Sequence, residues 1–261
     1  MPSYKIKEFP KSRIATVDVC AIGLQKHHIA AMIEIDVTGS REKIKKYRDK
    51  THRISFTAWL IKAISHTLKD YEQAASYLKG KRKAVIFDDI NVSIVVEKSI
   101  NGQKVPIPLI IEKASERSIE SITQQISDAR DKVLTAKDIV LHSRSSQLER
   151  IYYSQPGFIR RYFWKYLLRH PHLAFSKMGN VAVTSIGMMG NVKGWFIPVS
   201  VHPICFGISS ISMRPVVVDD KIEIRQILNM TVLLDHDVID GGVMARFISD
   251  LSANIERGIE L

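Results

Sequence analysis

Residues 229–248 have the sequence NMTVLLDHDVIDGGVMARFI, and this stretch says most about the fold. Its first part, Asn229 to Leu234, is apolar and contains β-branched residues, which is typical of a strand. The polar segment 235–242 contains two glycines and turns the chain. Apolar residues then recur three or four positions apart as far as Ile259. The stretch therefore predicts a strand and an amphipathic helix that are joined by a tight turn.

The rest of the sequence contains further patterns of these two kinds. Strands are expected at residues 29–37, 90–97, 105–111, 181–186, 203–211, 215–219 and 223–234. Helices are expected at residues 56–68, 119–133, 157–169 and 242–259, the first of them capped by Ser55. Asn101-Gly102 suits the turn of a hairpin. Because no internal repeat or flexible linker interrupts this order, it predicts a single α+β domain over residues 1–261, a mixed sheet covered by helices.

The composition is that of a soluble globular protein. Of 261 residues, 45% are hydrophobic and 25% are charged. Two cysteines, Cys20 and Cys205, are too few for a disulfide framework or a zinc site of their own. No run of 18 apolar residues predicts a transmembrane segment, and Met1 to Lys11 lacks the apolar core of a secretory signal. We therefore expect a cytoplasmic protein.

The chain is strongly basic, with 38 Lys and Arg residues against 27 Asp and Glu residues and a formal net charge of +11. Such an excess favours an anionic partner, which could be nucleic acid, a phosphorylated cofactor, an acidic protein or a membrane surface. It could equally reflect a well-solvated surface. No RNA-binding or helix-turn-helix signature is present, so nucleic acid is not expected as a partner.

An aromatic and basic insertion occupies about residues 142–177. Its expected helix, Gly157 to Arg169, has the sequence GFIRRYFWKYLLR. Such a helix could stack on single-stranded nucleic acid, lie on an anionic membrane or dock on a protein. The simplest interpretation is that its aromatic side chains pack inward while its arginines face water.

His236 is the strongest candidate for catalysis. A histidine held between a strand end and a helix start suits a general base near neutral pH, although a histidine in a turn is often only structural. The nearby Asp235, Asp237 and Asp240 could suggest a metal site, but this is a weak signal. The His27-His28 pair does not have zinc-ligand spacing. No metal is expected.

The motif Asp235-His236-x-x-x-Asp240-Gly241 resembles the active-site segment of the acyltransferase component of 2-oxo acid dehydrogenase complexes, the dihydrolipoamide acyltransferases. This family shares its fold with chloramphenicol acetyltransferase. Residues 179–190, GNVAVTSIGMMG, are similar to the family's second motif, a strand ending in Ser or Thr before a glycine-spaced loop. The segments 28–38, 55–63 and 105–118 also match in order. The resemblance covers most of residues 11–261.

The resemblance implies transfer of an acyl group between coenzyme A and a thiol such as dihydrolipoamide. His236 would be the general base and Thr184 would stabilise the oxyanion, with Ser185 in that role if the alignment shifts by one residue. Asp240 would hold the turn by pairing with an arginine near the N-terminus, for which Arg13 is the candidate. Gly187 and Gly241 would have structural roles at the site. Residues that bind coenzyme A are not identified.

The chain also departs from the family pattern. Asp237 stands where the family usually has arginine, and no lipoyl or subunit-binding domain is recognised, so a lipoyl group would come from another protein. The resemblance further implies a homotrimer with its active site between subunits, and the apolar Met188-Met189, Trp195 and Phe196 suit an interface. A small-molecule O- or N-acetyltransferase and a catalytically inactive scaffold remain alternatives.

Overall fold

A six-stranded mixed sheet forms the centre of the protein. The computed structural model describes residues 2–7, 11–48, 54–80, 82–100, 103–131, 151–187, 190 and 192–261. The strands lie in the order β1-β8-β7-β6-β4-β5, and β6 runs parallel to both of its neighbours. Their bounds are β1 His28–Asp36, β4 Val92–Ile100, β5 Gln103–Ile111, β6 Val181–Ser185, β7 Ile204–Val218 and β8 Lys221–Asp235. A separate two-stranded sheet pairs β2, Tyr77–Lys79, with β3, Lys83–Val85.

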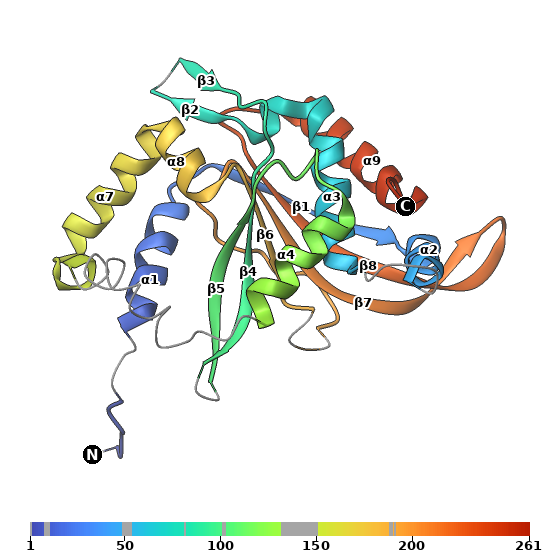
Figure 1. The fold of residues 1–261 in the computed structure, drawn as a ribbon, viewed down its shortest axis with the longest axis horizontal. Helices are drawn as coiled ribbons and strands as arrows, with labels where there is room; N and C mark the ends of the chain where they lie inside the picture. The colour runs from blue at the N-terminus through green and yellow to red at the C-terminus, as the bar shows by residue number, and fades with distance from the viewer. Residues whose placement is uncertain are drawn as a thin grey trace.

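Helices cover one face of the large sheet, as Figure 1 shows for α3, α4 and α9. The helices are α1 Lys11–Gly23, α2 Thr38–Arg48, α3 Phe56–Leu68, α4 Ile119–Asp131, α7 Gly157–Arg169, α8 Pro171–Met178 and α9 Gly241–Arg257, with a 3-10 segment η1 at Lys69–Ala75. The main core between the helices and the sheet includes fully buried Trp59, Phe206 and Phe247. The predicted α+β class is confirmed.

Local signals set the start of α3 as expected. Ser55 has extended backbone angles, and its hydroxyl accepts a hydrogen bond from the N–H of Ala58 at 3.0 Å. The predicted hairpin is present as the antiparallel pair β4 and β5. Its turn at Asn101-Gly102 lies outside the described residues, as do residues 49–53 and 132–150.

The C-terminal strands are longer than expected. In place of the three shorter strands predicted between residues 203 and 234, β7 and β8 are two 15-residue strands that form a projecting hairpin. Pro215 does not end β7 because β6 pairs with β7 only as far as Ile208, so beyond that point one edge of β7 has no neighbouring strand within the described part of the chain. Prolines are tolerated on such an edge.

The insertion packs against the N-terminal helix, a contact that the sequence did not predict. Helices α7 and α8 lie beside α1 at one end of the molecule in Figure 1. A second, smaller apolar cluster joins them to β2 and to the segment before β7 through Ile22, Tyr77, Leu167, Ala174, Met178 and Val201.

The expectation that the aromatic residues of the insertion pack inward is wrong for four of them. Phe158, Tyr162, Phe163 and Tyr166 are 67%, 64%, 52% and 47% exposed. Arg160, which was expected to face water, instead lies against α1. The reason is that α1 offers a buried carboxylate, which attracts the arginine and turns the opposite, aromatic side of α7 outward.

Candidate active site

The turn that carries His236 is held from both sides by backbone hydrogen bonds. The N–H of Asp235 donates to the carbonyl of Pro203, and the N–H of His236 donates to the carbonyl of His27, each at 3.0 Å. Asp235 is buried and forms an ion pair with Lys26. The imidazole of His236 is exposed beyond these anchors. The backbone is therefore fixed, while the catalytic candidate remains open to a reactant.

Asp237, the residue that departs from the family pattern, pairs with a histidine. Its carboxylate lies 2.9 Å from Nδ1 of His27. Both side chains are accessible, and the hydrogen bond and charge of Asp237 raise the pKa of His27 above its ordinary value. The negative charge next to His236 therefore has a cationic partner whenever His27 is protonated.

Asp240 holds the start of α9. Its carboxylate accepts a hydrogen bond from the N–H of Val243 at 3.0 Å, as a helix N-cap does. Among the described residues, no ion pair joins Asp240 to Arg13, which is exposed in α1, so their pairing stays a prediction. The partner that Asp240 does have is this backbone N–H at the start of α9.

The two glycines assigned to the site differ in how strictly they are required. A Cβ atom on Gly187 would lie 2.5 Å from the carbonyl oxygen of Ser209, so no side chain fits without a backbone shift. A Cβ atom on Gly241 would have no atom within 4 Å. Packing therefore demands glycine at position 187 but not at position 241.

Two further histidines form hydrogen bonds near the turn: His28, which pairs with Asp235 across the sheet, and His202, which the sequence did not single out. Nε2 of His28 lies 2.9 Å from the carbonyl of His202, and Nε2 of His202 lies 2.9 Å from the carbonyl of Met178. Burial lowers the pKa of His202 to about 4, so this imidazole is neutral at pH 7 and donates to that carbonyl. These contacts connect β1 to α8.

The two candidate hydroxyl residues lie on opposite faces of the sheet. Val183 of β6 belongs to the core beneath the helices. Because side chains alternate between the two faces along a strand, Ser185 lies on the same face as Val183. Thr184 points to the other face. There it shares a row with Gly207 of β7, which the segment from Phe196 to Pro198 covers.

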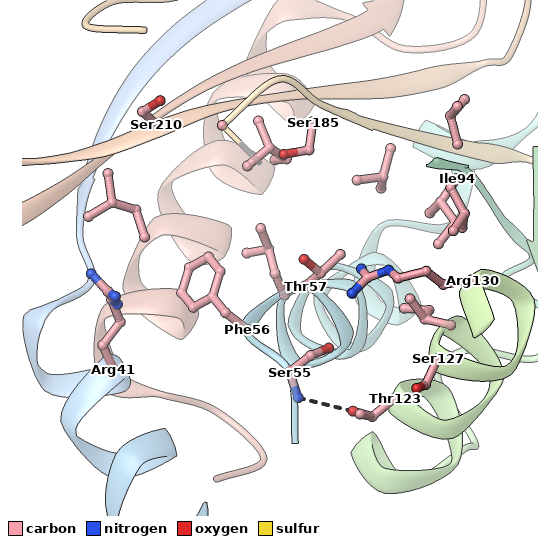
Figure 2. Close-up of a pocket in the computed structure, with 18 of the residues that line it drawn as sticks. Arg41, Ser55, Phe56, Thr57, Ile94, Thr123, Ser127, Arg130, Ser185 and Ser210 are labelled. Carbon is pink, nitrogen blue, oxygen red and sulfur yellow. Dashed lines mark hydrogen bonds between the residues drawn. The ribbon is translucent and has the colours of Figure 1, made fainter. Parts of the chain in front are cut away.

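A cavity of about 900 Å³ opens between α3, α4 and the sheet. Figure 2 shows Arg41 and Arg130 on opposite sides of it, Phe56 and Thr57 between them, and Ser185 on the facing wall. No acidic side chain lines the cavity among the described residues. This cavity was not predictable from the sequence, because its residues come from segments far apart in the chain. The only local signal was the polar side of α4, where Thr123, Ser127 and Arg130 follow one another at helical spacing.

Within one chain, His236 and Thr184 lie at different positions along the sheet. Thr184 pairs with Gly207, and Gly207 pairs with Thr231. Asp235 lies four residues farther along β8, which is roughly 14 Å at about 3.4 Å per residue. His236 follows that residue, too far for its imidazole to meet the hydroxyl of Thr184 in the same chain.

Residues 24–142 and 169–261 match the family described as 2-oxoacid dehydrogenases acyltransferase (catalytic domain). The chain belongs to this family. Among curated relatives, it is 28% identical over 239 residues to the lipoamide acyltransferase component of the branched-chain alpha-keto acid dehydrogenase complex of Bacillus subtilis, a match that covers 88% of this chain and 46% of that protein. The chain spans about half the length of the curated relatives it matches.

Solved structures show the same fold. A probable dihydrolipoamide acetyltransferase from Listeria monocytogenes superposes with a TM-score of 0.70 at 23% identity, over 98% of this chain and 95% of that one. A chloramphenicol acetyltransferase superposes with a TM-score of 0.51 at 9% identity, over 97% and 98% of the two chains. The resemblance to the acyltransferase family is confirmed, and so is the chloramphenicol-acetyltransferase-like fold.

The family match leaves out residues 143–168, which include almost all of α7. These residues lie within the segment 142–177 that the sequence predicts to be an insertion, and that assignment stays a prediction. Among the described residues, no helix is long and apolar enough to cross a membrane. No group of three or more potential metal ligands is found in the same part of the chain.

Proposed function

We propose that this chain is a coenzyme A-dependent acyltransferase, which moves an acyl group between coenzyme A and a thiol such as dihydrolipoamide. The observation that carries the proposal is the exposed imidazole of His236, on a turn whose backbone is anchored on both sides, within a chain of the acyltransferase family. The cavity lined by two guanidinium groups supports it.

In the proposed mechanism, the imidazole of His236 takes the proton from the attacking thiol. This step matters because the thiolate is the nucleophile, whereas a free thiol is mostly protonated at pH 7. The thiolate attacks the thioester carbonyl and forms a tetrahedral oxyanion, to which the hydroxyl of Thr184 donates a hydrogen bond. Collapse of this intermediate breaks the bond to the original thiol, and the imidazolium returns its proton to the departing thiolate.

The cavity is the proposed site for coenzyme A. Its apolar walls, which include Phe56 and Ile126, suit the pantetheine arm, and its hydroxyl groups suit the amides of that arm. Arg41 and Arg130 supply positive charge for the phosphates, without an acidic side chain in the described lining. The basic character of the chain therefore has a role in binding coenzyme A.

The active site is proposed to form between two copies of the chain, in a homotrimer. The separation of His236 and Thr184 along the sheet supports this, because a second copy must bring its histidine to the hydroxyl of the first. Trp195 and Phe196 belong to the segment near Thr184, and Trp195 is 37% exposed in the single chain. Met188-Met189, also expected at the interface, lies outside the described residues.

The direct test is release of coenzyme A from acetyl-CoA in the presence of free dihydrolipoamide. The wild-type chain is expected to produce acetyl-dihydrolipoamide and coenzyme A in equal amounts. His236→Ala should abolish the reaction with an unchanged circular dichroism spectrum, because an exposed imidazole leaves no core cavity. Activity of the variant within about tenfold of the wild type would contradict the general-base role. A wild-type chain without activity towards any thiol, alcohol or amine would favour the inactive scaffold.

The shared site is tested by combining two inactive variants. His236→Ala and Thr184→Ala chains are co-expressed with different tags, and mixed oligomers are purified. In a trimer with each site between neighbours, every mixed trimer keeps one intact site of three, so roughly a third of the wild-type activity should return. A site within one chain predicts no recovery, and light scattering reports whether the mass is that of a trimer.

The thiol substrate is proposed to be a protein-bound lipoyl group in the cytoplasm. The chain matches relatives named as dehydrogenase complex components over about half of their length, and the matched part is the catalytic domain. Lipoylated protein should then replace free dihydrolipoamide in the assay with a lower KM. No metal is assigned to the reaction.

A further inference from the structure

Helix α7 presents an apolar stripe to the outside of the protein. Its exposed apolar residues fall in two adjacent rows with four-residue spacing, one of Phe158, Tyr162 and Tyr166 and the other of Ile159 and Phe163. Their exposed fractions lie between 40% and 67%. A soluble surface normally scatters large apolar residues singly, so a continuous stripe on one helix indicates a contact surface.

A row of positive charge runs along the edge of this stripe. Arg161, Lys165 and Arg169 are exposed at the same four-residue spacing, next to the row that begins at Phe158. None of the three forms an ion pair with an acidic side chain of the described chain. From residue 151 to residue 178 the sequence contains no aspartate or glutamate. The surface therefore combines apolar area with uncompensated positive charge.

The opposite side of α7 is fixed to the protein. Nε of Arg160 lies 2.6 Å from the buried carboxylate of Asp18 in α1, and the hydroxyl of Tyr152 donates to the same carboxylate at 3.0 Å. Nε1 of Trp164 donates to the hydroxyl of Tyr152 at 3.1 Å, and Leu167 is 5% exposed in the smaller apolar cluster. Because these contacts hold the inner face, α7 cannot turn its aromatic rows inward without breaking a buried ion pair.

We propose that α7 binds the surface of an anionic lipid bilayer, with its aromatic rows at the level of the headgroups and its basic row on the lipid phosphates. Charge complementarity favours a bilayer as the binding partner. The apolar rows match its apolar interior, and the basic row matches its negatively charged surface. Tyrosine and phenylalanine suit the boundary between the two. The helix lies at the periphery in Figure 1, and its exposed rows are accessible to a bilayer surface.

The test is co-sedimentation of the full-length chain with vesicles of phosphatidylcholine, with and without phosphatidylglycerol. The chain should bind vesicles that contain phosphatidylglycerol and not those of phosphatidylcholine alone, and binding should weaken at about 0.5 M NaCl because salt screens the charges. The absence of binding at low salt would overturn the proposal. Equal binding to both vesicle types would contradict the role of the basic row.

Paired variants at the same positions separate a lipid contact from loss of structure. Phe158→Ser with Phe163→Ser should weaken vesicle binding by about tenfold or more, whereas Phe158→Leu with Phe163→Leu should retain it, since apolar insertion needs no particular shape. The triple variant Arg161→Gln, Lys165→Gln and Arg169→Gln should no longer bind the anionic vesicles. The matched variant Arg161→Lys with Arg169→Lys should keep both the binding and its weakening by salt. Unaltered binding by the serine pair would refute the surface.

Light scattering distinguishes the lipid from a second copy of the chain. If the serine pair changes the mass of the oligomer, the stripe is a contact between copies and the proposal is wrong. The expected mass is that of the wild type. Acyl transfer is measured on the same samples and should be unchanged without vesicles, so failure of the membrane proposal and failure of the catalytic proposal give different results.

Discussion

The carboxylate of Asp237 lies 2.9 Å from Nδ1 of His27, the residue whose carbonyl binds the backbone of His236. An acidic residue therefore stands beside the candidate base without being isolated, because its partner comes from the segment that also fixes the turn. The reversal of charge relative to the family pattern is accommodated locally, and it gives no reason to regard the site as inactive.

The pairing of Asp237 with His27 predicts a raised pKa for the imidazole of His27. Its pKa should lie above the ordinary value, and Asp237→Asn should lower it, because the hydrogen bond and charge of Asp237 favour the imidazolium. A histidine with a raised pKa in the folded state contributes stability below its unfolded pKa, and this contribution is lost as pH rises through the folded pKa. Titration of the imidazole protons by NMR measures the shift. An identical midpoint in Asp237→Asn would show that the pair does not persist in solution.

The opposite orientations of Thr184 and Ser185 make their alanine variants informative. Thr184→Ala should reduce turnover by roughly 10² to 10³ with little change in the KM for acyl-CoA, since the lost hydrogen bond forms in the transition state. Ser185→Ala should act mainly on the KM, because Ser185 lines the cavity. Steady-state kinetics on both variants decide the assignment. A full loss of turnover at Ser185 with none at Thr184 would move the oxyanion site to the helix-covered face.

The contact between α1 and α7 predicts a specific pattern of stability. Arg160→Ala should lower the midpoint of thermal unfolding by several degrees, because it leaves the buried carboxylate of Asp18 without a cation. Asp18→Asn combined with Arg160→Ala should lose less than the sum of the two single changes, since neither charge then remains alone. Thermal melts of the wild type, the two single variants and the double variant provide the comparison. Strictly additive losses would mean that the two side chains do not interact.

His202 predicts a loss of stability in acid. Its pKa is about 4 in the folded protein, against about 6.5 in an unfolded chain, so between these values the unfolded state binds more protons. The free energy of unfolding should therefore decrease as pH falls from 6.5 to 4, by on the order of 2 kcal/mol from this residue. In His202→Gln, whose side chain can still donate to the carbonyl of Met178, the free energy of unfolding should decrease less between these two pH values. Urea titrations of both chains at pH 6.5 and pH 4 measure this difference. The same pH dependence in both chains would contradict a buried neutral imidazole.

Much of the fold could be predicted because its signals are local. Ser55 begins α3 with a hydrogen bond to a residue three positions later, and the helix predicted from Gly157 to Arg169 has these same bounds in the structure. His236 was identified from its position between a strand and a helix, which adjacent residues specify. Caps, periodicity and turn residues act over a few positions, so the sequence alone determines them.

Other features depended on partners that are distant in the chain. Asp18 draws Arg160 inward across 142 residues, and this contact decides which side of α7 faces outward. The cavity is lined by Arg41, Arg130 and Ser185, which come from three separate segments of the chain. The alternation along β6 assigns Thr184 and Ser185 to opposite faces, but only the packed helices show which face is covered. Such arrangements follow from long-range packing and the burial of charge, which no short stretch of sequence specifies.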